Sequence, residues 1–106
     1  KYGMSMCVLG MSAEFKRDGV AVNALWPATA IETAALKMIP GIDTNFCRKP
    51  EIMADAAYAI LSKDSKSNTG NFYVDEEVLR AEGVTDFDQY SVVPGTKDLL
   101  KDFFLD

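Results

Sequence analysis

The chain has 106 residues, of which 48% are hydrophobic and 25% charged, the balance of an ordinary soluble globular domain. Its net charge is −5 and it has no run of Lys or Arg, which argues against nucleic acid or an anionic membrane as a partner. No apolar stretch approaches the ~20 residues of a transmembrane helix. Histidine is absent and the two cysteines, Cys7 and Cys47, lie far apart, which argues against a zinc or copper site. We therefore expect an intracellular, reducing compartment.

The first predicted elements are a helix over residues 3–17 and a strand over residues 19–25. Apolar side chains recur at helical spacing in the first, and Gly19 supplies its stop. We expect this helix to bury its apolar side chains, among them Met4, Cys7 and Met11. The strand follows almost without a loop, which is typical of α/β units.

The segment after this strand is the candidate ligand-binding edge. The strand ends at Trp26-Pro27 and opens into Ala-Thr-Ala-Ile-Glu-Thr, a loop rich in small residues and hydroxyls. Ligands of open α/β sheets gather at the C-terminal ends of the strands, so residues 27–33 are placed to bind one. Trp26 either lines a pocket or packs in the core. Thr33 either contacts a ligand or caps the short helix expected over residues 33–39, whose Met38 and Ile39 either form a lid or simply pack.

The second half of the chain is predicted to be helix, strand and tail. Pro50 opens an amphipathic helix that ends near residue 62, and its apolar face includes Met53. Residues 69–75 read as a strand, and a short acidic helix over residues 76–82 follows. We interpret the acidic run that starts at Asp75 as a solvated strand end rather than a catalytic carboxylate pair.

The predicted order is thus helix, strand, short helix, helix, strand and an irregular tail beyond Gly83. Two strands do not make a stable sheet by themselves. The fold class is therefore expected to be α/β, the C-terminal portion of a Rossmann-like, doubly wound parallel sheet.

Three motifs of this chain, taken in chain order, resemble those in the C-terminal half of a short-chain dehydrogenase/reductase. Lys1 resembles the lysine of the family's catalytic Tyr-x-x-x-Lys motif, with the helix running on. The family's next strand ends in Asn and then Pro-Gly, and Asn23 and Pro27 match this motif. Its last strand carries Thr-Gly and then Asp-Gly, which Thr69, Gly70 and Asp75 match. Ala28 and Glu76 replace the glycines that follow Pro27 and Asp75. The resemblance covers nearly the whole chain.

The resemblance implies that residues 1–106 are a partial catalytic domain. The glycine-rich cofactor loop, the catalytic serine and the catalytic tyrosine would all precede Lys1, and no tyrosine of this chain starts a Tyr-x-x-x-Lys motif. The N-terminal dinucleotide-binding half would therefore be missing. The chain alone is expected to be inactive.

For the intact protein the resemblance implies an oxidoreductase that transfers hydride between NADP or NAD and a carbonyl or alcohol substrate, lipid-like molecules included. Lys1 would be catalytic and cofactor-binding, because its ammonium holds the nicotinamide ribose and lowers the pKa of the upstream tyrosine. Further cofactor contacts would come from Pro27, Thr29 and Thr33, and from the backbone N–H and C=O of Ile31.

The resemblance also implies a homo-oligomer and a location in the peroxisome or mitochondrion. An alternative function is a non-catalytic interaction or oligomerisation module from an incomplete dehydrogenase-like protein, built on the helices over residues 3–17 and 50–62. A lipid-carrier domain would fit only the apolar C-terminal tail. Upstream sequence with a serine and a tyrosine in frame would separate these functions.

Overall fold

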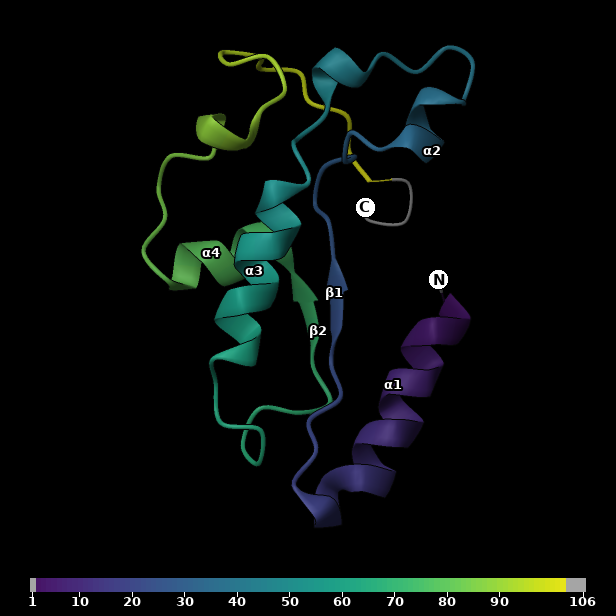
Figure 1. Cartoon of the computed structure of the whole chain (residues 1–106), viewed down its shortest axis with the longest axis vertical. Helices are drawn as coiled ribbons and strands as arrows, with labels where there is room; N and C mark the ends of the chain where they lie inside the picture. The colour runs from purple at the N-terminus through teal and green to yellow at the C-terminus, as the bar shows by residue number, and fades with distance from the viewer. Residues whose placement is uncertain (1, 103–106) are drawn as a thin grey trace.

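The structure is a computed structural model that describes residues 2–102 (Figure 1). Its helices and strands, in chain order, are α1 (Tyr2–Phe15), β1 (Ala24–Trp26), α2 (Ala34–Lys37), α3 (Glu51–Leu61), β2 (Phe72–Val74) and α4 (Asp75–Ala81). Short 3₁₀ turns cover Lys16–Asp18, Thr44–Phe46 and Asp88–Tyr90. The predicted order is confirmed. Within residues 2–102, no helix combines the length and apolar character needed to cross a membrane.

The two strands form a small parallel sheet, with Leu25 opposite Tyr73 in the register. β1 is shorter than the predicted strand over residues 19–25 and lies later, because its ladder partner in the described part of the chain, β2, begins only at Phe72. Gly70, at a φ of 76°, turns the chain into β2. A Cβ at Gly70 would lie 3.3 Å from the Ser12 hydroxyl, so α1 passes close to this turn.

Side chains alternate across the sheet and meet helices on both faces. Leu25 and Tyr73 pack against the core formed with α3 and α4. Trp26 and Phe72 face the other way, where they line a hollow together with α1. Figure 1 shows the same arrangement, with α1 on one side of the strands and α3 and α4 on the other. The expected α/β layering is therefore confirmed.

The main core lies between the sheet, α3 and α4. α3 follows Pro50 and buries one residue per turn, Ile52, Ala56 and Ile60, as its periodicity predicts. The other buried members of this core are Val78, Leu79, Phe87 and Tyr90. Met53 is partly buried against this core, as expected. The segment beyond Gly83 is irregular, but its Phe87 and Tyr90 are part of the core.

A second, smaller core holds α2 to the segments around it. Its buried members are Ala30, Leu36 and Cys47, and the partly buried Val92 and Leu100 come from the tail. Cys47 is fully buried here, although the residues next to it in the sequence are mostly polar. Apolar side chains of residues 30–47 and of the distant tail therefore fix the region that follows β1.

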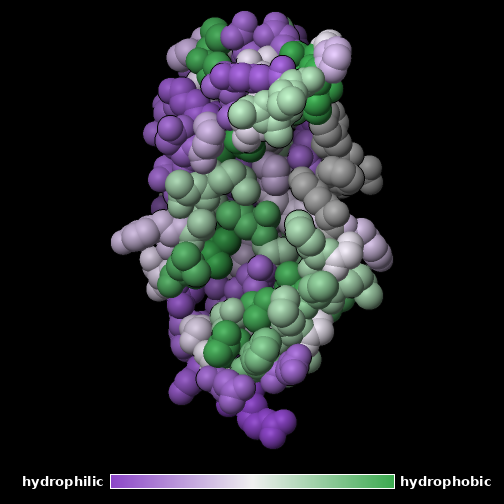
Figure 2. All heavy atoms as spheres, turned by 45° about the vertical axis from the view of Figure 1, so that its right-hand side comes forward, coloured by the Kyte–Doolittle hydropathy of each residue, from purple (hydrophilic) through white to green (hydrophobic). Residues whose placement is uncertain are grey.

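The prediction that α1 buries its apolar face is wrong for the described residues. Val8 alone among the α1 residues is buried, Met4 is 67% and Met11 40% exposed, and Cys7 is exposed as well. α1 is apolar on most of its sides, and just one of these sides meets the rest of residues 2–102. Figure 2, in which the α1 side is turned forward, shows the apolar surface that results.

Candidate functional site

The loop over residues 27–33 lies at the C-terminal end of the parallel sheet, as predicted. β1 leads into this loop, and the neighbouring strand β2 leads directly into α4. The two strand ends are joined by a hydrogen bond of 3.0 Å from the backbone N–H of Ala28 to Oδ1 of Asp75. This bond therefore holds the start of the loop in place against the start of α4.

The C-terminal tail pairs with one side of this loop. Thr29 and Lys101 form an antiparallel bridge, in which the N–H of Ala30 donates to the carbonyl of Leu100 at 2.8 Å. The N–H of Asp102 donates to the carbonyl of Ala28 at 3.1 Å. The tail is thus joined to the loop by an isolated β-bridge, and Thr29 is buried.

Arg48 pairs with the other side of the loop. Its N–H donates to the carbonyl of Ala30 and its carbonyl accepts from the N–H of Glu32, both at 2.9 Å. In this parallel bridge the residue opposite Arg48, Ile31, uses neither of its own peptide groups. Within residues 2–102 the N–H and C=O of Ile31 make no hydrogen bond. Because backbone polar groups are obligatory hydrogen-bonding groups, this pair is available to a ligand that carries a donor and an acceptor.

Thr33 caps α2, which is one of the two roles expected for it. Its hydroxyl accepts from the N–H of Leu36 at 3.2 Å, and its extended backbone (φ −131°, ψ 163°) is that of an N-cap. Met38 and Ile39, at the end of α2, are exposed, so packing does not account for Met38, which is 82% exposed.

Trp26 and Pro27 line a hollow between α1 and β1. The hollow has a volume of about 430 Å³ and is lined by Met4, Ser5, Val8, residues 23–27 and Met53. Trp26 is partly exposed and also lines a neighbouring hollow between α1 and the outer face of the sheet. Of its two expected roles, the geometry favours pocket lining.

Asp75 is fully buried at the start of α4, which corrects the expectation of a solvated strand end. Its Oδ1 accepts from Ala28 and, at 2.6 Å, from the backbone N–H of Glu76. Its Oδ2 is buried without a hydrogen-bond partner among the described residues. Burial raises the pKa of this carboxyl, although the two backbone hydrogen bonds and the nearby Arg48 oppose the rise.

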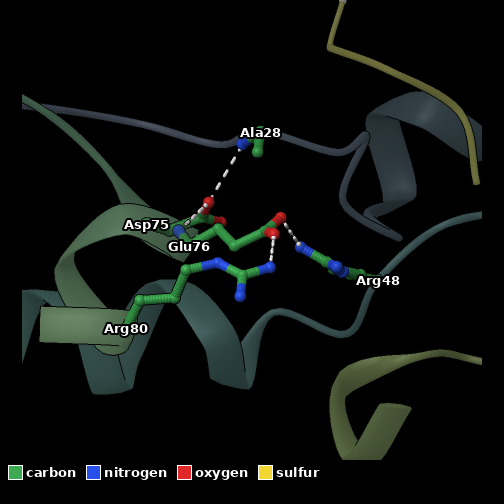
Figure 3. A network of polar contacts seen from close by, with 5 residues as sticks. All are labelled: Ala28, Arg48, Asp75, Glu76 and Arg80. Atoms are coloured by element: carbon green, nitrogen blue, oxygen red, sulfur yellow. Dashed lines mark hydrogen bonds and ion pairs between the residues drawn. The ribbon is translucent and has the colours of Figure 1, made fainter. Parts of the chain in front are cut away.

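Glu76 joins two arginines in the network of Figure 3. Its carboxylate accepts from Arg48 at 2.9 Å and from Arg80 at 2.5 Å. Burial alone would raise the pKa of Glu76, but these two hydrogen bonds and charges outweigh it and lower the pKa. The guanidinium groups of Arg48 and Arg80 also lie over the Phe87 ring, 5.5 Å and 4.8 Å from its centre.

Sequence reasoning missed Arg48 and Asp75 as parts of this site. Arg48 stands in a connector without a motif, and its place beside the loop depends on chain folding. Asp75 carried a usable signal, because it matches the Asp of the last-strand motif at the point where an apolar strand ends. Lys1 lies outside the described residues. Among residues 2–102, no group of three or more His, Cys, Asp or Glu could hold a metal ion.

Comparison with known proteins identifies relatives of the chain. No family model matches the chain. Proteins named hydroxysteroid dehydrogenase-like protein 2 are 62% identical over 108 residues in Xenopus laevis and 58% identical over 108 residues in Homo sapiens. Both comparisons cover 100% of this chain and 25% of the relative.

Two solved structures match the fold and the sequence together. A short chain dehydrogenase from Mycobacterium thermoresistibile superimposes with a TM-score of 0.87 at 45% identity, over 100% of this chain and 38% of that one. A protein of Xanthomonas campestris assigned as a dehydrogenase gives a TM-score of 0.91 at 51% identity, over 98% of this chain and 38% of that one. Over its whole length the chain is thus similar to proteins of the short-chain dehydrogenase kind.

These structural similarities confirm the predicted fold class, an α/β unit that corresponds to a C-terminal portion of a Rossmann-like dehydrogenase. The chain spans a quarter of the length of the curated relatives and 38% of the solved dehydrogenases. These relatives and solved structures are named as dehydrogenases or as dehydrogenase-like proteins.

Proposed function

We propose that residues 1–106 form the nicotinamide-side part of an NAD(P)-dependent dehydrogenase/reductase. The observation that carries this proposal is the free N–H and C=O of Ile31, held at the C-terminal end of a parallel strand. A primary carboxamide has one oxygen that accepts and one NH₂ that donates, so it complements the two groups of a single peptide residue. The nicotinamide ring carries such a carboxamide.

The cofactor supplies or accepts the hydride, and the residues of this chain orient it. Ile31 would hold the carboxamide and so set which face of the ring meets the substrate. Pro27 and Thr29 would line the same side, and Thr33 would act as the cap of α2 more than as a ligand. Lys1 would hold the ribose hydroxyls and lower the pKa of an upstream tyrosine, which delivers the proton.

The substrate side would be the hollow beside Trp26. Its lining is mostly apolar, with Met4, Val8, Leu25 and Met53 among the lining residues. An apolar wall of this kind suits a carbonyl or alcohol carbon on a hydrophobic, lipid-like body. The choice between NAD and NADP, and a peroxisomal or mitochondrial location, stay predictions.

The upstream half of the domain would cover the exposed face of α1. Tyr2, Met6 and Leu9 are at least half exposed and line a second apolar hollow with Trp26 and Phe72. A contiguous apolar surface of this kind marks an interface. The same surface is what the alternative function, an oligomerisation module, would use, and a homo-oligomer of the intact protein is compatible with both.

The test is cofactor binding by the full-length protein that contains this chain. Titration with NADH and NADPH, followed by fluorescence of the reduced nicotinamide, should give saturable binding. Ile31→Pro removes the N–H donor and should weaken binding, by about two- to tenfold for one lost hydrogen bond. Ile31→Val keeps both peptide groups and is the matched control. Equal affinity of the two variants, with both folded by circular dichroism, would reject the assignment of Ile31.

A further inference from the structure

Both ends of the segment that presents Ile31 are tied to the first turn of α4. At one end, Ala28 donates its N–H to the carboxylate of Asp75. At the other end, the peptide groups of Ala30 and Glu32 are bonded to Arg48. The Arg48 guanidinium, in turn, is bonded to Glu76, the residue after Asp75. Figure 3 shows the bond of Ala28 to Asp75 and the bond of Arg48 to Glu76, which meet at these two consecutive acidic residues.

Arg48 is the only described residue whose peptide groups bond to both neighbours of Ile31. A shift of Arg48 therefore moves the carbonyl of Ala30 and the N–H of Glu32 together, and the peptide groups of Ile31 lie between them. The side chain of Arg48 is 8% exposed, so its position is set by Glu76 and by the Phe87 ring rather than by water. The hydrogen bond to Glu76 thus fixes the position of Arg48, and through Arg48 the position of the Ile31 backbone.

These contacts carry a desolvation cost, so they contribute little to the stability of the fold. Asp75 is fully buried, and two polar atoms of the network, Asp75 Oδ2 and Arg48 Nε, lie buried without a hydrogen-bond partner among the described residues. Desolvation of charged groups offsets much of their attraction, and apolar replacements of buried ion pairs are often neutral or stabilising. What the network provides in addition is a fixed geometry, because charge-assisted hydrogen bonds are short and directional.

We propose that Arg48 and Asp75 are positioning residues, which hold the two peptide groups of Ile31 in the geometry that a nicotinamide carboxamide requires. This inference rests on the proposed function. It assigns no contact with the cofactor to either side chain. A mispositioned Ile31 should therefore weaken recognition of the carboxamide while the rest of the cofactor still binds.

The chain offers a matched control for Arg48. Arg80 bonds to the same carboxylate and lies over the same ring, but its side chain is 59% exposed and its backbone does not touch the loop. Arg48→Met and Arg80→Met each remove one charge and one hydrogen bond to Glu76. Just the first variant disturbs the group that is bonded to both sides of Ile31.

The experiment compares two ligands in the full-length protein. NADH carries the carboxamide, and ADP-ribose keeps the adenine, pyrophosphate and ribose but lacks the nicotinamide; NADPH and the 2′-phosphate of ADP-ribose replace them where NADPH binds more tightly. For Arg48→Met we expect the Kd of NADH to rise about two- to tenfold, the size of one lost hydrogen bond, with the Kd of ADP-ribose unchanged within about twofold. Arg80→Met should leave both constants within about twofold.

Asp75 is tested by what its carboxylate does for Ala28. Asp75→Asn keeps an acceptor oxygen for the N–H of Ala28 and should retain most of the NADH affinity, whereas Asp75→Ala removes the acceptor and should weaken NADH binding selectively. Should Asp75→Ala not fold, the Arg48 pair and Asp75→Asn still decide. A parallel loss of NADH and ADP-ribose affinity, or no loss in Arg48→Met, would overturn the positioning roles. Failure of the unmodified protein to bind NADH more tightly than ADP-ribose would instead overturn the proposed function.

Discussion

Ala28 and Asp75 lie 47 residues apart, yet the N–H of the first donates to the buried carboxylate of the second at 3.0 Å. The bond links the points at which two parallel strands end, so the loop after β1 and the helix after β2 are held as one unit. Asp75 also begins α4, where a negative charge is favourable next to the free N–H groups of a helix N-terminus. A single buried carboxylate therefore orders both sides of the candidate cofactor edge.

The roles of Thr29 and Thr33 should separate in a pair of substitutions. Thr33→Val removes the N-cap of α2 and should lower the free energy of unfolding by about 1 kcal/mol, with cofactor affinity nearly unchanged. Thr29→Val removes a hydroxyl that makes no hydrogen bond within residues 2–102, so it should leave stability nearly unchanged and weaken cofactor binding about two- to tenfold. Urea unfolding without cofactor and NADH titration measure the two effects.

Thr33→Ser is the control for the cap, because serine keeps the oxygen that accepts from Leu36. It should restore most of the lost stability. If Thr33→Val weakens NADH binding by more than Thr29→Val does, the two assignments must be exchanged.

Lys1 should matter for turnover and little for folding. In the full-length protein, Lys1→Met removes the charge that would lower the pKa of the upstream tyrosine, so turnover at neutral pH should fall by orders of magnitude. Activity should recover in part as the pH is raised, because the tyrosine then loses its proton without help. A pH–rate profile with a Tm measurement tests this. Unchanged turnover would show that Lys1 does not correspond to the catalytic lysine.

Tyr90 should make stability depend on pH on the alkaline side. Tyr90 is a buried residue whose hydroxyl donates to Asp55 at 2.6 Å, and burial and this carboxylate raise the pKa of Tyr90 from 10.0 to about 12. The folded state therefore keeps the proton more tightly than the unfolded state does. Its stabilisation is fully present below pH 10 and is lost as the pH rises through about 12.

Tyr90→Phe tests this dependence through urea unfolding at pH 8 and pH 11. The variant should be less stable at pH 8, by about 1.5–3 kcal/mol for a hydrogen bond to a charged group, and its stability should fall less between the two pH values. Tyr58→Phe, at a 76% exposed position on the same helix as Asp55, should behave as the unmodified protein does. An identical alkaline loss in all three proteins would remove Tyr90 as its cause.

Local patterns accounted for much of the fold and for the position of the site. The helix after Pro50 buries Ile52, Ala56 and Ile60 because apolar residues at this spacing share one helix face. The cap at Thr33 and the loop at the end of β1 were also predictable, because each depends on a few residues that are neighbours in the sequence. The length of β1 was not, because a strand is defined by its partner and β2 is short.

The sequence by itself determined the order of elements, the periodic face of α3 and the placement of residues 27–33 at a strand end, because each follows from residues close in the chain. Only the tertiary structure decided that Asp75 is buried, that Arg48 bonds to both sides of Ile31, and that Lys101 lies beside Thr29. It also decided which side of α1 is covered, since a helix with apolar residues on most sides has no preferred face of its own. These contacts join segments tens of residues apart, and no local pattern encodes which distant partner will desolvate a given side chain.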